Sequence, residues 1–233
     1  MEQTTTEAPV LLNALAWIDK NRKQVILGVI VLALVGSVVG YLKWSAREKE
    51  LAAGRDLSQA IFSSRQAGQN ASEAMLRVAA ANPKTAAGEQ ALLLAGNEQF
   101  NAGKYAEAQA TFERFRSDYP GSKMVAQAIY GAGTALIAQG KRDEAISAFK
   151  DCVDRYPTAP IAAHAKFALA SEYEKQNKSD LALPLYQEIL QQGTGGSVVN
   201  EAAQRAQALL PNIMSARMDA PSESGETNSA LTP

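Results

Sequence analysis

Cysteine and histidine are nearly missing from this sequence of 233 residues, which contains one of each. With a single residue of either type, the chain has no redundancy from which to build a disulfide framework, a Cys/His zinc site or a catalytic Cys–His pair. The formal net charge is −1, so there is also no basic surplus to hold the phosphates of a nucleic acid. The composition therefore disfavours a metalloenzyme, and we expect neither a nucleic acid partner nor a cofactor.

The few residues that could still carry chemistry stand alone. His164, within "IAAHAKFALA", has no second histidine and no carboxylate at a fixed spacing to complete a metal site. Cys152 falls on the helical face that carries Phe149 and Ala145, where a free cysteine behaves as a small buried hydrophobe. Residues 193–197, "GTGGS", lack the Lys and Ser/Thr that end a P-loop, and they follow a predicted helix where a P-loop requires a strand. We therefore expect no catalytic residue, no metal ligand and no small-molecule substrate.

Charge is absent from one long stretch near the N-terminus. Residues 25–42, "VILGVIVLALVGSVVGYL", contain no charged residue and are just long enough, as a helix, to cross a hydrocarbon core about 30 Å thick. A cleaved signal peptide is the competing interpretation, but the run exceeds a typical h-region, and "KWSAREKE" follows in place of a small-residue cleavage site. Tyr41 and Trp44 stand at one border, as amphipathic rings do at a membrane interface. We predict an uncleaved, single-pass signal anchor that lies in the lipid bilayer.

The flanks of this span leave its orientation open, because basic residues stand on both sides and the positive-inside rule does not decide between them. Residues 1–24 contain Leu11, Leu15 and Ile18 at helical spacing, which suits a short helix lying in the membrane interface. A frayed tail that merely contains leucines is the alternative. Composition alone therefore predicts membrane attachment but no topology.

Prolines recur at a fixed interval later in the chain. Pro83, Pro120 and Pro157 are 37 residues apart, and each closes an alanine-rich segment with helical spacing of its apolar residues. Residues 140–157, "GKRDEAISAFKDCVDRYP", agree in this register at seven positions with residues 103–120, "GKYAEAQATFERFRSDYP". Identities that fall in one register indicate an internal repeat.

Small and large apolar residues follow the same period. Four copies place an alanine four residues before a large apolar residue: Ala71 and Met75, Ala108 and Phe112, Ala145 and Phe149, Ala182 and Tyr186. A second small residue repeats upstream, at Gly96, Gly133 and Ala170. Two close-packed helices need this combination, because the small residue admits the neighbouring backbone and the large side chain fills the gap beside it. Each repeat is therefore expected to be a helix–turn–helix hairpin.

Such hairpins cannot bury their apolar faces alone, so we predict an all-α fold in which a transmembrane helix precedes a solenoid of stacked hairpins. Residues 43–85 are assigned to a helical linker with a degenerate first hairpin, and residues 86–196 to the clear repeats. Residues 197–218 are expected to form a capping helix. Residues 219–233 lack apolar periodicity and are expected to be a disordered tail.

The repeated order of small residue, glycine, alanine, aromatic residue and proline resembles the tetratricopeptide repeat, lengthened here to 37 residues. Two departures occur in the last repeat. Pro184 lies inside its second helix, where it should kink the helix or delay its start, and Thr194 replaces the closing proline.

With its single span, the layout also resembles the bacterial inner-membrane proteins that serve as ancillary subunits of the Sec translocon. That resemblance implies an N-terminus in the cytoplasm and repeats in the periplasm. It also implies other proteins as partners: the Sec translocon, periplasmic chaperones or client polypeptides.

In the tetratricopeptide register, the first helix of each hairpin lines the concave side of the solenoid. The exposed positions there are Gln90, Asn97, Phe100, Gln127, Tyr130, Thr134, His164, Phe167 and Ser171. This mixture of amides, hydroxyls and rings suits an extended polypeptide, because rings offer stacking area and amides offer hydrogen bonds to its backbone. The Lys/Arg clamp by which some family members hold a C-terminal carboxylate is not present. Two interpretations of Tyr130 and Phe167 stay open, a contact for a bound chain or packing against the adjacent repeat.

Two functions of different classes fit these features. The first is a membrane-anchored, non-enzymatic scaffold that binds proteins and assists secreted or envelope polypeptides at or near the translocon. The second is a self-assembling structural module of an envelope complex. An enzyme is the weakest of the three interpretations, since no constellation of reactive residues supports it.

Overall fold

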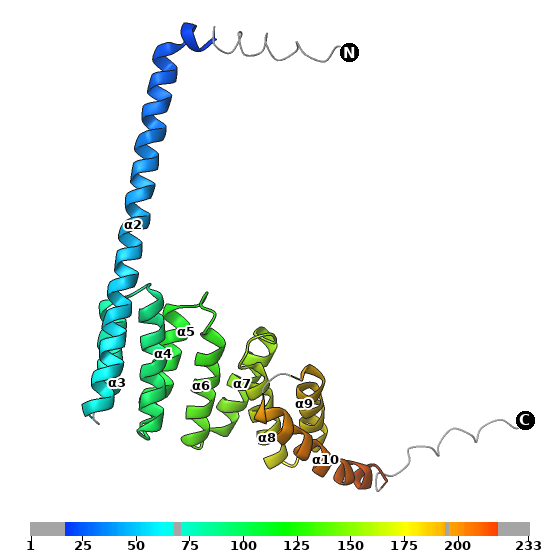
Figure 1. Cartoon of the computed structure of the whole chain (residues 1–233). Helices are drawn as coiled ribbons and strands as arrows, with labels where there is room; N and C mark the ends of the chain where they lie inside the picture. The colour runs from blue at the N-terminus through cyan, green and yellow to red at the C-terminus, as the bar shows by residue number, and fades with distance from the viewer. Residues whose placement is uncertain (1–16, 68–70, 194–195, 219–233) are drawn as a thin grey trace, which may run out of the picture. The chain divides into compact units, whose positions relative to one another are not determined.

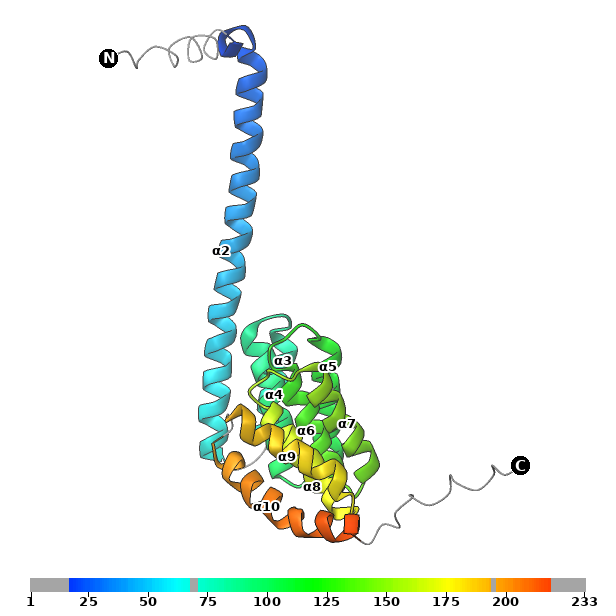
Figure 2. The same ribbon diagram turned by 90° about the vertical axis from the view of Figure 1, so that its right-hand side faces the viewer.

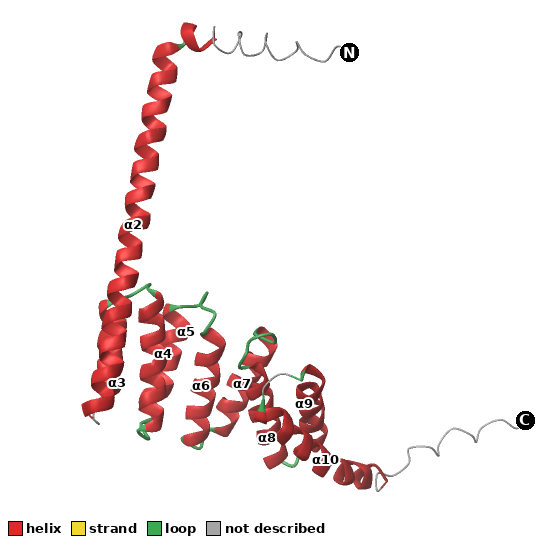
Figure 3. Ribbon diagram, in the orientation of Figure 1, coloured by secondary structure: helices red, strands yellow, loops and turns green. Residues whose placement is uncertain are grey.

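The computed structural model describes residues 17–67, 71–193 and 196–218, and within these ranges it contains helices and the turns between them but no β-strand (Figure 3). Residues 1–55 and 56–233 form two separately compact units. The fold class expected from the sequence, all-α with an apolar N-terminal helix and a solenoid of hairpins, is confirmed.

Helix α2 (Arg22–Ala67) contains the apolar residues 25–42 in the first unit. Over the described ranges it is the one helix that is long and apolar enough to cross a membrane. The apolar side chains of residues 26–42 are exposed, with 73% exposure at Leu32. Ser37 donates a hydrogen bond of 2.8 Å to the carbonyl of Ala33, so this hydroxyl is satisfied within the helix itself. The helix does not end with the apolar run but continues through residues 43–55.

Two predicted segments fall wholly or largely outside the described residues. The interfacial helix was expected within residues 1–24, of which residues 1–16 are not described, and residues 17–20 form a single helical turn. The disordered tail was expected at residues 219–233, which also lie outside.

The second unit consists of the end of α2 and a series of shorter helices. In chain order these are α3 (Ala71–Ala81), α4 (Ala86–Asn101), α5 (Tyr105–Asp118), α6 (Val125–Ala138), α7 (Arg142–Arg155), α8 (Ala162–Lys175), α9 (Ser179–Gln192) and α10 (Ser197–Met218). Helix α4 pairs with α5, α6 with α7, and α8 with α9, and the three hairpins stand in a row (Figure 1). Upstream, α3 packs on α4, and the side-chain amide of Asn82 donates a 3.2 Å hydrogen bond to Asp56 near the end of α2.

The 37-residue period of the sequence reappears in the helix boundaries. The second helices of the hairpins begin at Tyr105, Arg142 and Ser179, each 37 residues after the last. Pro184 therefore does not delay the start of α9, so this one of the two expected effects is wrong, and a kink at Pro184 stays a prediction. The proline costs the helix one backbone hydrogen bond close to its beginning, while Ala182 and Tyr186 on either side of it are fully buried. Packing decides where this helix starts.

The turn inside each hairpin is one motif used three times. The residue after the helix C-cap adopts a left-handed conformation, at Gly103, Gly140 and Asn177. The next backbone N–H then reaches back to a carbonyl five residues earlier, at 2.9 Å in each case (Lys104 to Gln99, Lys141 to Leu136 and Lys178 to Tyr173). This is the Schellman pattern, which satisfies the last carbonyls of a helix and reverses the chain.

Within each hairpin, an aromatic ring lies against the backbone of the first helix. A Cβ atom added to Gly96 would stand 2.6 Å from Cε1 of Phe112, and one added to Gly133 would stand 2.6 Å from Cε1 of Phe149. The third hairpin places Ala170 and Tyr186 at the equivalent positions, and both are fully buried. The predicted pairing of small and large residues is therefore confirmed, and it sets how closely the two helices approach.

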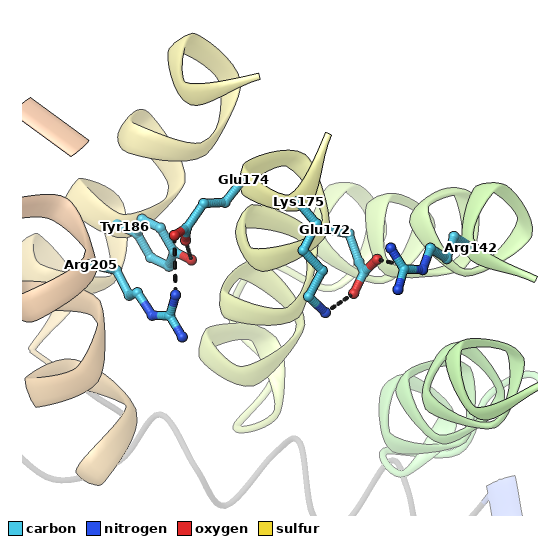
Figure 4. Close-up of polar contacts among 6 residues, drawn as sticks. All are labelled: Arg142, Glu172, Glu174, Lys175, Tyr186 and Arg205. Carbon is cyan, nitrogen blue, oxygen red and sulfur yellow. Dashed lines mark hydrogen bonds and ion pairs between the residues drawn. The ribbon is translucent and has the colours of Figure 1, made fainter. Parts of the chain in front are cut away.

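Polar side chains connect neighbouring hairpins, and they differ from one junction to the next. Between the first two hairpins, the side-chain amide of Gln139 donates to Oε1 of Gln109 at 2.9 Å. At the next junction, Glu172 of α8 is 4% exposed and lies 3.9 Å from Nε of Arg142 on α7, with Nζ of Lys175 at 2.5 Å from its other oxygen (Figure 4). The carboxylate is buried, but it has cations on two sides.

Helix α10 covers the exposed side of the last hairpin (Figure 2). Its apolar face joins the core around Tyr186. Glu174 receives hydrogen bonds from the Tyr186 hydroxyl and from Nη1 of Arg205, both at 3.1 Å, so one carboxylate links α8, α9 and α10 (Figure 4). Burial raises the pKa of the Tyr186 hydroxyl, and the hydrogen bond to Glu174 adds to the rise. The hydroxyl therefore stays a donor at neutral pH.

The contact between glycine and ring predicts the outcome of a pair of substitutions. Gly133→Val places a side chain against a ring that cannot move out of the core, so it should lower the free energy of unfolding by about 1–3 kcal/mol. Gly121→Val adds the same side chain where no atom lies within 4 Å, and should stay within about 0.5 kcal/mol of the parent chain. Urea unfolding of the full chain in detergent, followed by far-UV circular dichroism, measures both. Equal effects would mean that the hairpin packing is misassigned.

Cys152 offers a second check of this packing, because it is the only cysteine in the chain and is fully buried. Burial raises the pKa of its thiol from 9.0 to about 11, so about a hundredfold less thiolate is present at pH 8 than in the unfolded chain. We expect the folded chain to react with Ellman's reagent at least that much more slowly than the chain in urea. The stability that the buried thiol contributes is present below pH 9 and is lost as the pH rises through 11. Rapid labelling of the native chain at pH 8 would contradict this placement.

Candidate functional site

The nine predicted site residues lie on the first helices of the three hairpins, and we call the surface they form the first-helix face. Helix α4 carries Gln90, Asn97 and Phe100, α6 carries Gln127, Tyr130 and Thr134, and α8 carries His164, Phe167 and Ser171. All nine are exposed or half-buried. The 37-residue period places Gln90, Gln127 and His164 at equivalent positions of this face. It does the same for Asn97, Thr134 and Ser171.

A cavity of about 350 Å³ between α4 and α6 brings five of the nine together. These five are Asn97, Phe100, Gln127, Tyr130 and Thr134. Gln90, His164, Phe167 and Ser171 do not line it. We call this space the α4–α6 cavity.

Sequence reasoning missed four residues that line the same cavity, namely Leu93, Phe112, Gly131 and Ile161. Leu93 could have been found, because it stands 37 residues before Tyr130 and is therefore its equivalent in the first hairpin. Gly131 also gave a signal, since the equivalent positions in the other hairpins are Leu94 and Ala168. Phe112 was assigned to the core, and it is 2% exposed while also forming a wall.

Tyr130 and Phe167 turn out to have different surroundings. The ring of Tyr130 lies 5.8 Å from that of Phe149 and 6.3 Å from that of His164, measured between centroids, and it also lines the cavity. The ring of Phe167 lies 5.5 Å from that of Tyr186 and packs onto the core of the last hairpin. Packing against the adjacent repeat is therefore seen for Tyr130, through His164, whereas Phe167 packs within its own hairpin. Only Tyr130 lines the cavity, and a contact of either ring with a bound chain stays a prediction.

The cavity carries no charged side chain among its lining residues. Burial raises the pKa of Tyr130, although a hydrogen bond with Thr134 opposes the rise, so the phenol stays neutral at physiological pH. The side-chain amides of Asn97 and Gln127 are exposed, and neither forms a hydrogen bond with another described residue. The site can therefore offer van der Waals contact, two free amides and the hydroxyl groups of Tyr130 and Thr134.

His164 sits beside this cavity without taking part in it. Its ring stands edge-on to Tyr130, and its Nδ1 atom is buried without a hydrogen-bond partner among the residues described. In the same residues, no cluster of three or more His, Cys, Asp or Glu side chains is arranged to hold a metal ion.

Comparison with known families identifies the repeats. One model of the tetratricopeptide repeat matches residues 90–122, and a second matches residues 130–197. The chain contains tetratricopeptide repeats. The residues matched include all of α5, α7, α8 and α9 and most of α4 and α6, so the α4–α6 cavity lies between the first helices of two successive tetratricopeptide hairpins. No curated protein matches the chain by sequence.

Solved structures of similar fold include two of MamA. One is 18% identical, with a TM-score of 0.49, and covers 80% of this chain and 99% of that one. A MamA point mutant is 21% identical over 62% of this chain and 76% of its own, with a TM-score of 0.46. BtubC (BKLC) from P. vanneervenii is 12% identical over 81% of this chain and 98% of its own, with a TM-score of 0.48.

The different surroundings of the first-helix side chains predict different costs of removing them. Phe167→Ser takes a half-buried ring off the core, and we expect it to lower the free energy of unfolding by about 1–3 kcal/mol, less than the value for a fully buried ring. Gln127→Ser removes an exposed amide without partners and should change stability by no more than about 0.5 kcal/mol. Urea unfolding of both variants tests the assignment. A negligible effect of Phe167→Ser would show that its ring is free to serve a bound chain instead.

Proposed function

We propose that this chain is a membrane-anchored, non-enzymatic scaffold whose tetratricopeptide repeats bind polypeptide segments on the first-helix face. The observation that carries the proposal is the α4–α6 cavity, which combines apolar walls with the unpartnered amides of Asn97 and Gln127. A polypeptide offers the complementary groups, since it has apolar side chains at intervals and a backbone N–H and C=O at nearly every residue. A cavity with apolar walls and no charged side chain among its lining residues supports binding rather than chemistry.

Helix α2 supports the membrane anchor in this proposal. The apolar side chains of residues 26–42 are exposed in the part of the chain that the structure describes, and the hydrophobic effect favours moving such a surface from water into lipid. The resemblance of the layout to single-span translocon subunits extends the proposal to the bacterial inner membrane, with the repeats in the periplasm. There the scaffold assists secreted or envelope polypeptides beside the Sec translocon, together with periplasmic chaperones.

Site-specific crosslinking tests the binding function. A photoreactive phenylalanine at Gln127, introduced into the full chain in native membranes, should crosslink to secreted or envelope polypeptides that mass spectrometry can name. The same group at Gln191, exposed near the end of α9 and outside the cavity, serves as the matched control and should yield at most a few per cent of those products. Equal yields from both positions would contradict binding at the first-helix face. Products that contain only a second copy of the chain would favour the self-assembling structural module.

Protease accessibility tests the location. We expect protease added to intact spheroplasts to degrade the repeats, because the proposal places them outside the cytoplasm. A cytoplasmic protein probed in the same sample must stay intact, which shows that the membrane is closed. Repeats that stay protected until detergent opens the membrane would sink the periplasmic assignment.

A further inference from the structure

The junction between the first two hairpins differs from the next one at the positions that shape the α4–α6 cavity. On α6 the residue facing the preceding hairpin is Gly131, and a Cβ atom there would stand 2.7 Å from Cζ of Phe112. The equivalent residue on α8 is Ala168, which is half-buried and packs against the core. Because Gly131 has no side chain, nothing at this position separates the ring of Phe112 from the cavity, and the ring forms one of its walls.

The two junctions also differ in the side chain that lies where the α4–α6 cavity has its counterpart between α6 and α8. Leu93 of α4 has Tyr130 as its counterpart on α6. The Tyr130 ring lies against both Phe149 and His164, so an aromatic side chain of the protein itself fills the place at the second junction. At the first junction the smaller Leu93 leaves that place open. The cavity therefore follows from two residues, Leu93 and Gly131, that depart from the pattern of the next hairpin.

The lining decides what kind of group can enter. A carboxylate or ammonium placed in this cavity would lose part of its hydration and would meet no opposite charge on the walls, which costs more than burying an apolar group. The volume of about 350 Å³ is near the lower limit for small-molecule sites, which begin at about 300 Å³. Such a space suits one bulky side chain better than a cofactor.

We infer that the α4–α6 cavity is a subsite for a single bulky, uncharged apolar side chain, aromatic or aliphatic, of a polypeptide held on the first-helix face. The amides of Asn97 and Gln127 bond the backbone on either side of that side chain. The inference rests on the proposed function and adds a sequence preference to it: the repeats select segments by one apolar residue, and segments with a charge at that residue are rejected.

Capped amino acids test the subsite directly, because each combines one side chain with two backbone amides. The full chain, labelled with 3-fluorotyrosine and held in lipid nanodiscs, is titrated with N-acetyl amides of phenylalanine, leucine, alanine, glutamate and lysine. The ¹⁹F resonance of Tyr130, assigned by its loss in Tyr130→Phe, is the readout, and that of the distant Tyr156 is the control. We expect the phenylalanine and leucine amides to shift the Tyr130 resonance at least tenfold more strongly than the glutamate and lysine amides at equal concentration.

Two variants show whether the response comes from the cavity. Asn97→Ala and Gln127→Ala each remove an exposed, unpartnered amide, so the fold should be kept while binding of the phenylalanine amide weakens by about threefold to tenfold. Gly131→Ala adds a methyl group against Phe112 and should abolish the shift. If Gly131→Ala proves unstable, the two amide variants decide alone. Equal shifts from charged and apolar amides, or an unchanged affinity for the phenylalanine amide in folded Asn97→Ala and Gln127→Ala, would overturn the subsite.

The same variants separate this inference from the proposed function. Should client crosslinking at Gln127 persist unchanged in a folded Gly131→Ala chain, the scaffold function stands and the subsite is wrong. Should both crosslinking and the response to the phenylalanine amide be missing from the parent chain, both fall. A phenylalanine amide that binds where no polypeptide crosslinks would indicate a small-molecule site and would also overturn the inference.

Discussion

An aromatic ring resting on the backbone of a neighbouring helix is the contact on which the repeat unit depends. Gly96 and Gly133 have no side chain, so the rings of Phe112 and Phe149 reach the first helix of their hairpins directly. That contact sets the separation of the two helices, and the Schellman turns at Gly103 and its equivalents then return the chain at a fixed angle. Hairpins built on the same contact and the same turn stack into the row of α4 to α9, and this places their first helices side by side on the first-helix face.

Most of this architecture could be predicted from the sequence, because it depends on residues that repeat. The spacing of proline, alanine and aromatic residues indicates the hairpins, and an uncharged run of 18 residues indicates α2. One prediction failed where the local preference of a residue opposes the packing around it. Pro184 was expected to kink its helix or to delay its start, but α9 starts in the same register as its equivalents, with the neighbours Ala182 and Tyr186 buried. Local preference therefore gave way to tertiary packing, which no single position reveals.

The candidate site was predictable only in part, and for a related reason. Periodicity places the nine side chains on one face, but it treats the hairpins as alike. The cavity exists because the hairpins differ. Gly131 is smaller than its equivalents Leu94 and Ala168, and Leu93 is smaller than its equivalents Tyr130 and Phe167. Whether a smaller residue leaves a space or lets its neighbours close in depends on how firmly those neighbours are held. Here Phe112 is fixed in the core, so the space stays open.

The polar contacts between hairpins differ from junction to junction and therefore favour one order of the hairpins. Repeats that resemble each other this closely could dock in the wrong order, a known way for repeat proteins to misassemble. Gln139 finds Gln109 at the first junction, whereas the equivalent pair at the second junction is Gln176 and Ile146, which cannot bond in this way. Docked one hairpin too early, α8 would bring its buried Glu172 to Tyr105 and lose Arg142. The order of the hairpins thus depends on side chains that are not part of the repeated pattern.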